Sequence, residues 1–301
     1  MNPVLNATAA LETPSGKGAS DENFQVGSWL LPARLRPHVA AFYAFVRAAD
    51  DIADNPDLAP DDKVARLHRF EAALTGCATL PASLPKAAAL RASLAATGVS
   101  PTHALDLLAA FKCDATKLRY RDWADLLGYC ALSASPVGRF LLDLHGEANE
   151  LYRFSDPLCD ALQVLNHLQD CQADYRGLDR VYLPLDLFAA AGIGIEALDQ
   201  PAASPALRQV LDRTLDGVDD LLNAAGDLPR ALRSRRLAAE SAVILEMARR
   251  LARELRARDP LAERVELSRA RFLQCGLAGL GRLLWDRRWI LRRPAPRPVP
   301  R

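Results

Sequence analysis

Two pairs of aspartates, each with a four-residue step, are the residues of this sequence best suited to carry out chemistry. Asp50 and Asp54 lie in the segment YAFVRAADDIAD, and Asp170 and Asp174 lie in QVLNHLQDCQADYRGLDRVYLP. On a helix, residues i and i+4 lie on one face, one turn apart. Carboxylates this close repel each other unless a cation lies between them. Two such helices facing each other would therefore form an oxygen-rich site suited to Mg²⁺ and a diphosphate.

The first pair belongs to a longer polar stripe. Tyr43, Arg47, Asp50 and Asp54 follow one another at i, i+4, i+7 and i+11. Such a stripe is either the solvated face of a helix or one wall of a site, and the apolar residues on its other sides favour the site. Arg47 is placed to pair with Asp50 or to donate to a phosphate oxygen. Asp51 lies about 100° around the helix, where it either reaches a water of the site or is exposed.

The second pair also extends a stripe, formed by Gln163, Asn166, Asp170 and Asp174 at i, i+3, i+7 and i+11. Asparagine is unfavourable inside a helix, so Asn166 calls for a reason. Its amide either serves a metal-bound water or a phosphate, or bridges to a neighbouring helix. His167 lies off the stripe, and we expect a hydrogen-bonded histidine of the core or surface rather than a ligand.

A loop carrying cationic side chains is expected after the second stripe. The segment YRGLDRVYLP places Arg176, Asp179, Arg180 and Tyr182 there. Cations beyond an acidic face could close over a diphosphate, and Arg180 is the preferred candidate. An ion pair of Arg180 with Asp179 or with another carboxylate is equally consistent with the spacing.

The elements that must position these residues are helices throughout. Apolar residues recur at helical spacing, whereas the alternation typical of strands is scarce, with RVYLP as the best short extended piece. No fixed-period repeat or Ser/Gly linker divides the chain, so we predict one all-α domain of about ten helices around its site. The predicted helical segments cover residues 33–54, 59–76, 84–98, 100–116, 120–146, 155–175, 204–228, 235–257 and 268–291.

Composition narrows the class of protein. The 301 residues carry a formal charge of +1, which gives no general field for nucleic acid or an anionic membrane. Six scattered cysteines without metal-ligand spacing indicate reduced, mostly buried thiols of a cytosolic protein. No secretory signal and no apolar run of about 18 residues is present. We expect a cytoplasmic protein that is either soluble or peripheral to the inner face of the membrane.

The sequence predicts three regions: a flexible segment over 1–20, a helical domain over 21–291, and a Pro/Arg-rich tail over 292–301. The tail is either a frayed end or a membrane contact. The glycines of GLAGLGRL have the wrong order for a dinucleotide fingerprint and lie in a predicted helix, which favours a close helix–helix contact there.

On these residues the chain resembles the squalene/phytoene synthase family, the head-to-head prenyl synthases. The most specific segments are LPARLRPHVAAFYAFVRAADDIAD and QVLNHLQDCQADYRGLDRVYLP. Together with KLRYRDWADLLGYCALSASPVGR, they are most similar to the branch that forms hydroxysqualene in hopanoid biosynthesis. The resemblance covers residues from about 22 to 289 and implies the isoprenoid synthase fold, an all-α bundle around a central apolar cavity.

The resemblance also implies residue roles. Asp50, Asp54, Asp170 and Asp174 would bind Mg²⁺, the only cofactor expected. The implied catalytic residues are Arg47, Tyr129, Asn166 and Gln169, and the implied substrate-binding residues are Tyr43, Arg47, Gln163, Asn166, Arg180 and Tyr182.

Two positions depart from the family pattern. Ala173 replaces an acidic residue of many relatives, which removes a carboxylate off the stripe and is not expected to disable metal binding. Gln169 replaces an arginine found in many phytoene and squalene synthases. Loss of that cation could alter how diphosphate leaves or where a carbocation is quenched.

The implied reaction converts presqualene diphosphate and water to hydroxysqualene and diphosphate, in coupling with other hopanoid-pathway enzymes and without a nucleic acid partner. Condensation of two farnesyl diphosphates to presqualene diphosphate, squalene or dehydrosqualene uses the same aspartates and stays open. A non-catalytic helical scaffold is the alternative outside enzymes, and the presence of all four aspartates speaks against it.

Overall fold

Proline and glycine set the bounds of the first helices. The structure is a computed structural model that describes residues 31–76 and 84–290, with side chains up to Trp285. Pro60 and Pro85 open two helices, where a missing backbone N–H costs nothing, and Gly76 and Gly98 follow them in the left-handed conformation with φ of 77° and 73°. These helices are α1 (Arg36–Ala53), α2 (Pro60–Thr75), α3 (Pro85–Thr97) and α4 (Thr102–Asp114).

One predicted helix is wrong in its extent, because the segment 120–146 forms two helices. They are α5 (Trp123–Ser133) and α6 (Ser135–Leu144), which meet at Ala134 with φ −126° and ψ −53°. Pro136 lies at the start of α6 and cannot donate a backbone hydrogen bond to a preceding turn. The helix therefore breaks there, and the chain changes direction.

The second acidic stripe lies on the longest helix, α7 (Tyr152–Leu178). It runs further than the expected 155–175, so Arg176 belongs to its last turn and not to the loop that follows. Asp179 ends the helix in the left-handed conformation with φ 50°. After it, Val181 forms an isolated parallel bridge with Arg119, in line with the extended piece predicted from RVYLP.

The remaining helices complete an all-α fold, as the sequence predicts, and the described residues contain no strand beyond that isolated bridge. None of the helices in the described part is both long and apolar enough to cross a membrane. The remaining helices are α8 (Leu185–Ala190), α9 (Pro205–Ala224), α10 (Leu228–Ala231), α11 (Arg235–Ala257) and α12 (Arg269–Ile290).

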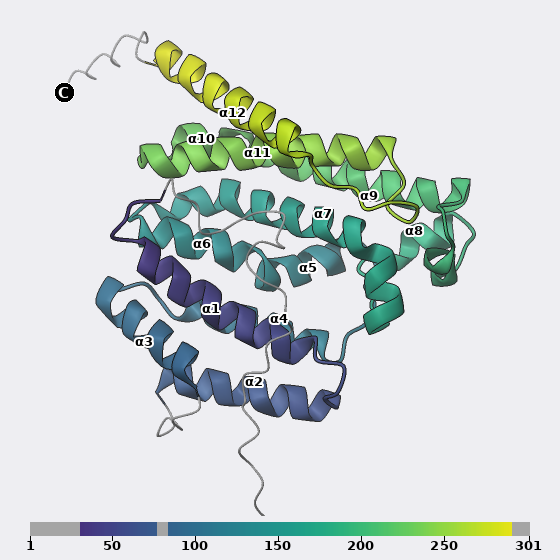
Figure 1. Ribbon diagram of the computed structural model, residues 1–301, viewed down its shortest axis with the longest axis horizontal. Coiled ribbons are helices and arrows are strands. Elements are labelled where there is room, and N and C mark those ends of the chain that lie inside the picture. The colour runs from purple at the N-terminus through teal and green to yellow at the C-terminus, as the bar shows by residue number, and fades with distance from the viewer. Residues whose placement is uncertain (1–30, 77–83, 291–301) are drawn as a thin grey trace, which may run out of the picture.

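The helices stack in layers, with α2 and α3 at one end of the molecule and α12 at the other (Figure 1). Two groups of buried side chains hold the layers together. One is formed mainly by α1 to α4 with Phe140 and Leu144 of α6, and the other by α5, α7, α9 and α11 with the loop around Val181 and Tyr182. The C-terminal ends of α1 and α7 are connected by a contact between Asp54 and Arg180.

Close helix contact explains one glycine of GLAGLGRL. A Cβ atom at Gly279 of α12 would lie 2.7 Å from the carbonyl oxygen of Ala242 on α11, whereas Gly276 and Gly281 have open space. The close contact predicted for this motif is thus confirmed at Gly279. The predicted segments 1–20 and 292–301 lie outside the described residues.

Candidate active site

The first acidic stripe lies at the C-terminal end of α1, where Arg47 holds two carboxylates. Its guanidinium is 3.3 Å from Asp50 and 3.1 Å from Asp51. Asp51 is buried, with 8% of its side chain exposed, so the alternative that it faces solvent is wrong. Asp50 and Asp54, in contrast, each keep about a third of the side chain exposed, at 32% and 34%. These two carboxylates are therefore the accessible ones.

Arg180 connects the two acidic motifs. Its backbone N–H donates to the carbonyl oxygen of Asp174 at 3.1 Å, which fixes the residue at the end of α7. Its guanidinium reaches across to α1, where it donates to Asp54 at 2.6 Å and to the carbonyl oxygen of Ala53 at 3.2 Å. The sequence allows Arg180 to pair with Asp179 or with another carboxylate, and in the structure its partner is Asp54, which is distant in sequence. Asp179 pairs instead with Arg119.

The carboxylates on α1 carry an electrostatic penalty. The pKa of Asp50 is raised to about 7. The first cause is that the surrounding protein replaces most of the water around the carboxylate, although 32% of the side chain is still exposed. The negative charges of Asp54, Asp114 and Asp51 raise the pKa further, and Arg47 lowers it. An ordinary aspartate has a pKa near 4. A cation bound beside Asp50 would relieve the repulsion that raises its pKa.

An aromatic group lies beside these carboxylates. The rings of Tyr120, Tyr129 and Tyr182 have centroids 5.2–5.5 Å apart, and His167 stacks on Tyr182 at 3.5 Å. Asp114, the last residue of α4, accepts from the hydroxyl of Tyr129 at 2.8 Å and from that of Tyr182 at 3.3 Å. Tyr120, Tyr129, Tyr182 and His167 thus form a buried aromatic wall, and Asp114 contacts the hydroxyls of two of its tyrosines.

Burial shifts the pKa values of this wall in the direction that keeps it uncharged. It raises the pKa of Asp114 to about 6, even though Arg180 and the tyrosine hydroxyls act to lower it. It also raises the pKa of Tyr129 well above its usual value. The pKa of His167 falls to about 3 through burial and the neighbouring charge of Arg180. His167 is thus a neutral core histidine, as the sequence analysis favoured, although it stacks where hydrogen bonding was expected.

Three buried polar atoms of this region lack a hydrogen-bond partner among the described residues: the Tyr120 hydroxyl, Nε2 of His167 and Nε of Arg180. Buried polar groups are almost always satisfied by protein or water. Three unsatisfied atoms around one aromatic wall therefore indicate a place where water or a polar ligand belongs. These atoms and the partly exposed carboxylates of Asp50 and Asp54 are polar groups of the kind that hold a divalent cation and its diphosphate.

The structure places the other predicted site residues on the same two helices. Tyr43 on α1 and Gln163, Asn166 and Asp170 on α7 are all half-buried. Gln169 is buried and donates from its amide to the carbonyl oxygen of Val265, in the segment between α11 and α12. That contact gives Gln169 a packing function, and a catalytic role for it stays a prediction.

No three His, Cys, Asp or Glu side chains lie close enough together to hold a metal ion in the described part of the chain. Asp54 is already engaged by Arg180. A metal ion at the α1 motif therefore requires Arg180 to release Asp54 or share it.

Two residues that lie beside the site, Asp114 and Lys63, cannot be identified from the sequence alone. Asp114 carries no motif, and its burial at the end of α4 becomes visible only in the fold. Lys63 on α2 donates to the carbonyl oxygen of Ala53 at 2.8 Å, next to Arg180. Burial and Arg180 lower the pKa of Lys63, while Asp54 raises it. Neither residue has a local signal, because each reaches the site from a helix without two aspartates four residues apart.

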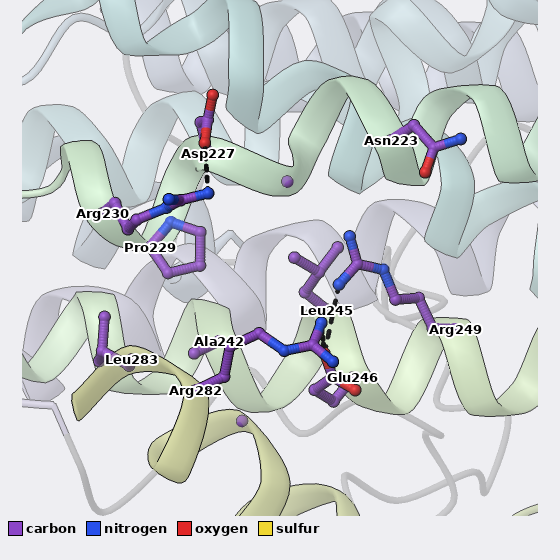
Figure 2. Close-up of a pocket in the computed structure, with 12 residues that line it drawn as sticks. Asn223, Asp227, Pro229, Arg230, Ala242, Leu245, Glu246, Arg249, Arg282 and Leu283 are labelled. Atoms are coloured by element: carbon purple, nitrogen blue, oxygen red, sulfur yellow. Dashed lines mark hydrogen bonds and ion pairs between the residues drawn. The ribbon is translucent and has the colours of Figure 1, made fainter. Parts of the chain in front are cut away.

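A separate pocket of about 240 Å³ lies between α10, α11 and α12 (Figure 2). Its arginines are matched by acids: Arg230 pairs with Asp227 at 2.9 Å, and Arg249 and Arg282 pair with Glu246 at 3.2 and 2.6 Å. The volume is below the roughly 300 Å³ at which small-molecule sites begin. We therefore assign this pocket to helix packing and the acidic region to chemistry.

Comparisons with known proteins agree with the geometry. The family model for squalene/phytoene synthase matches residues 18–271. The hydroxysqualene synthase of Rhodopseudomonas palustris is 45% identical over 296 residues, covering 98% of this chain and 99% of the relative. That of Zymomonas mobilis is 43% identical over 282 residues, covering 93% of each.

Two solved structures share the architecture. The squalene synthase HpnC from Alicyclobacillus acidocaldarius superposes with a TM-score of 0.69 at 31% identity, covering 79% of this chain and 90% of that one. A dehydrosqualene synthase in complex with ligand superposes with a TM-score of 0.73 at 22% identity, covering 87% and 92%. The second likeness concerns the fold alone.

Proposed function

Because this chain belongs to the squalene/phytoene synthase family, we propose that it converts presqualene diphosphate and water into hydroxysqualene and diphosphate, with Mg²⁺ as cofactor. The observation that carries the reaction class is the Arg180 connection, which ties the last aspartates of both acidic motifs into one region. The choice of product is supported by relatives named hydroxysqualene synthase at 43–45% identity along 86–98% of the chain.

The reaction balances without a redox partner. The carbon–oxygen bond to diphosphate breaks, and its electron pair leaves with the diphosphate. The C30 carbocation rearranges, and one water adds to it and loses a proton. No hydride is required, in contrast to a route that ends at squalene.

The four motif aspartates, Asp50, Asp54, Asp170 and Asp174, would hold the metal. Bound Mg²⁺ would supply Lewis-acid neutralisation of the diphosphate. Arg47 and Arg180 would add fixed donors to the leaving oxygens, in a buried setting where such donors act strongly. Arg180 is especially suited, because it is 6% exposed and already oriented by two protein oxygens.

The aromatic wall would shelter the cation. Tyr129 and Tyr182 present π-faces that attract positive charge, and Asp114 holds both hydroxyls. The same hydroxyls and the unsatisfied Tyr120 oxygen are the groups that could order the single water required for capture. Tyr43, Gln163 and Asn166 would contact the substrate from the half-buried faces of α1 and α7.

The test is product analysis by mass spectrometry. Purified protein is incubated with Mg²⁺ and presqualene diphosphate without a nicotinamide, and in a parallel tube with farnesyl diphosphate. A C30 alcohol in the first tube supports the proposal. Consumption of farnesyl diphosphate alone would move the chain to the condensing reaction, and a shift of product to squalene on adding NADPH would overturn water capture.

A further inference from the structure

The last carbonyl group of α1 accepts hydrogen bonds from two cationic side chains that belong to other parts of the fold. A helix leaves its final carbonyl oxygens without partners inside the helix, and its C-terminal end favours positive charge. α1 has no basic residue of its own in its last turn. Instead, the carbonyl oxygen of Ala53 accepts from the ammonium of Lys63 at 2.8 Å and from the guanidinium of Arg180 at 3.2 Å.

Lys63 reaches this oxygen from α2, which follows α1 after a short loop and runs back beside it (Figure 1). The residue lies close to the N-terminal end of α2, which begins at Pro60. That end of a helix disfavours positive charge. The electrostatics of α2 itself therefore do not explain a half-buried lysine at this position.

The ammonium of Lys63 has a neutral acceptor and no carboxylate partner among the described residues. The three carboxylates at this end of α1 are paired with Arg47 or Arg180. The pKa of Lys63 is lowered, first by burial and then by the charge of Arg180, against the raising effect of Asp54. Two cations that share one neutral oxygen repel each other, so this side of the site carries positive charge that an anion would balance.

Both cations keep hydrogen-bond donors for a ligand. An ammonium group has three N–H donors, and the Ala53 oxygen takes one of those of Lys63. Nε of Arg180 is buried and lacks a partner among the described residues. Next to them, the Asp54 side chain is 34% exposed. Phosphate oxygens accept from both kinds of side chain, from arginine through its planar fork and from lysine as a point charge.

We propose that Lys63 is a further substrate-binding residue, which donates from α2 to the diphosphate group beside Arg180. This role of Lys63 rests on the proposed function, which supplies the diphosphate. It gives the site a donor from a helix that carries none of the site residues predicted from the sequence. Because the diphosphate gains negative charge when the carbon–oxygen bond breaks, Lys63 would hold the released diphosphate as well as the substrate.

Isothermal titration calorimetry of the full chain with inorganic diphosphate and Mg²⁺ tests this role without turnover. Lys63→Gln keeps a donor for the Ala53 oxygen but removes the charge, and should weaken binding by about tenfold or more, as expected for the loss of a charged hydrogen bond. Lys63→Arg keeps the charge and should keep most of the affinity. The matched control is Lys112→Gln, which removes a partly buried lysine that pairs with Glu71 of α2 and should bind as the natural sequence does.

A double variant separates direct contact from positioning. If Lys63 binds diphosphate itself, Lys63→Gln should weaken binding further in a protein that already carries Arg180→Gln. If Lys63 only orients Arg180, the second substitution adds nothing. With presqualene diphosphate, we expect Lys63→Gln to raise KM more than it lowers kcat, because the contact is made both before and after the bond breaks. Circular dichroism of each variant establishes that the helical content is kept.

Chemical labelling of the natural sequence gives the same information without a substitution. Reductive methylation modifies accessible lysine amines, and mass spectrometry measures the extent at each residue. Inorganic diphosphate with Mg²⁺ should protect Lys63 and leave the modification of Lys112 unchanged.

The outcomes distinguish this role from the proposed function. Unchanged affinity in Lys63→Gln, a Lys63 amine that diphosphate does not protect, or a double variant that binds as Arg180→Gln does would overturn the role of Lys63 alone. A natural sequence that does not bind diphosphate would overturn both. Consumption of farnesyl diphosphate in place of presqualene diphosphate would overturn the proposed function alone, because both substrates carry the group that Lys63 binds.

Discussion

Arg180 and Asp54 are 126 residues apart in sequence, yet their side chains meet at 2.6 Å. The guanidinium is almost fully buried and the carboxylate is 34% exposed, so Asp54 remains open to a ligand on its other side. Arg180 thus neutralises Asp54, and the proposed function makes the same guanidinium a donor to diphosphate.

Replacement of Arg180 tests this dual role. Arg180→Gln keeps a hydrogen-bond donor but removes the charge, and we expect kcat/KM to fall by roughly 10²–10³-fold, in the range seen for loss of one preorganised donor. Arg176→Gln is the matched control, because Arg176 lies in the last turn of α7 and pairs with exposed Asp199. Similar losses in both variants would show that general charge, not the Asp54 contact, matters.

The hydroxyl of Tyr129 is a second point of test. Tyr129→Phe keeps the ring but leaves one Asp114 oxygen without its 2.8 Å donor. Loss of a buried partner costs about 1–3 kcal/mol, so the free energy of unfolding should fall by that amount in urea titrations. The alcohol product should also form more slowly, because the hydroxyl is among the groups proposed to order water. An unchanged stability would contradict the buried Tyr129–Asp114 contact.

His167 predicts a pH dependence of stability. Its pKa is about 3 in the folded protein and about 6.5 in an unfolded chain. Between these values the unfolded state binds more protons, so the free energy of unfolding falls as pH is lowered through this window. From pH 6.5 to pH 5 the loss from this group is about 2 kcal/mol. His167→Phe keeps a ring against Tyr182 and should lose less stability over that interval than the natural sequence does.

The α11–α12 contact offers a matched pair of glycine variants. Gly279→Ala would place a Cβ atom 2.7 Å from the Ala242 carbonyl oxygen, and the resulting overpacking should destabilise the protein by about 1–3 kcal/mol. Gly281→Ala meets no atom within 4 Å and should stabilise α12 by about 0.5–1 kcal/mol, because alanine is the better helix former. Thermal unfolding of the two variants should move in opposite directions, and parallel shifts would contradict the close contact.

Local signals in the sequence predict most helix ends, because a proline or glycine there favours a backbone conformation that starts or ends a helix. Pro60, Pro85, Gly76 and Gly98 are examples. The break at Ala134 was missed, although Pro136 could have revealed it. The extension of α7 to Leu178 runs through Gly177, a residue that lowers helix propensity. The residues on either side of it are held by other contacts, Arg176 by Asp199 and the N–H of Arg180 by the Asp174 carbonyl oxygen.

The candidate site is predictable only in part, for a different reason. The aspartate stripes are periodic, so their faces can be inferred from spacing alone. The partner of Arg180 cannot be inferred in this way, because Asp54 and Asp179 could each form an ion pair with it. Only the packing of α1 against the end of α7 decides between the two carboxylates. Asp114 and Lys63 reach the site from α4 and α2. Their contribution depends on how whole helices are arranged.

Whether the two acidic motifs form one site is tested most directly by replacing an aspartate of each. Asp50→Asn, Asp170→Asn and the double variant are assayed for the C30 alcohol, with circular dichroism to check helical content. Asp57→Asn serves as control, because Asp57 is exposed just beyond the first motif.

Residues that act as one unit are non-additive. We therefore expect each single variant to lose turnover to the same residual level, the double variant to be no worse, and Asp57→Asn to be fully active. Full activity in either single variant, or losses that multiply in the double variant, would contradict it.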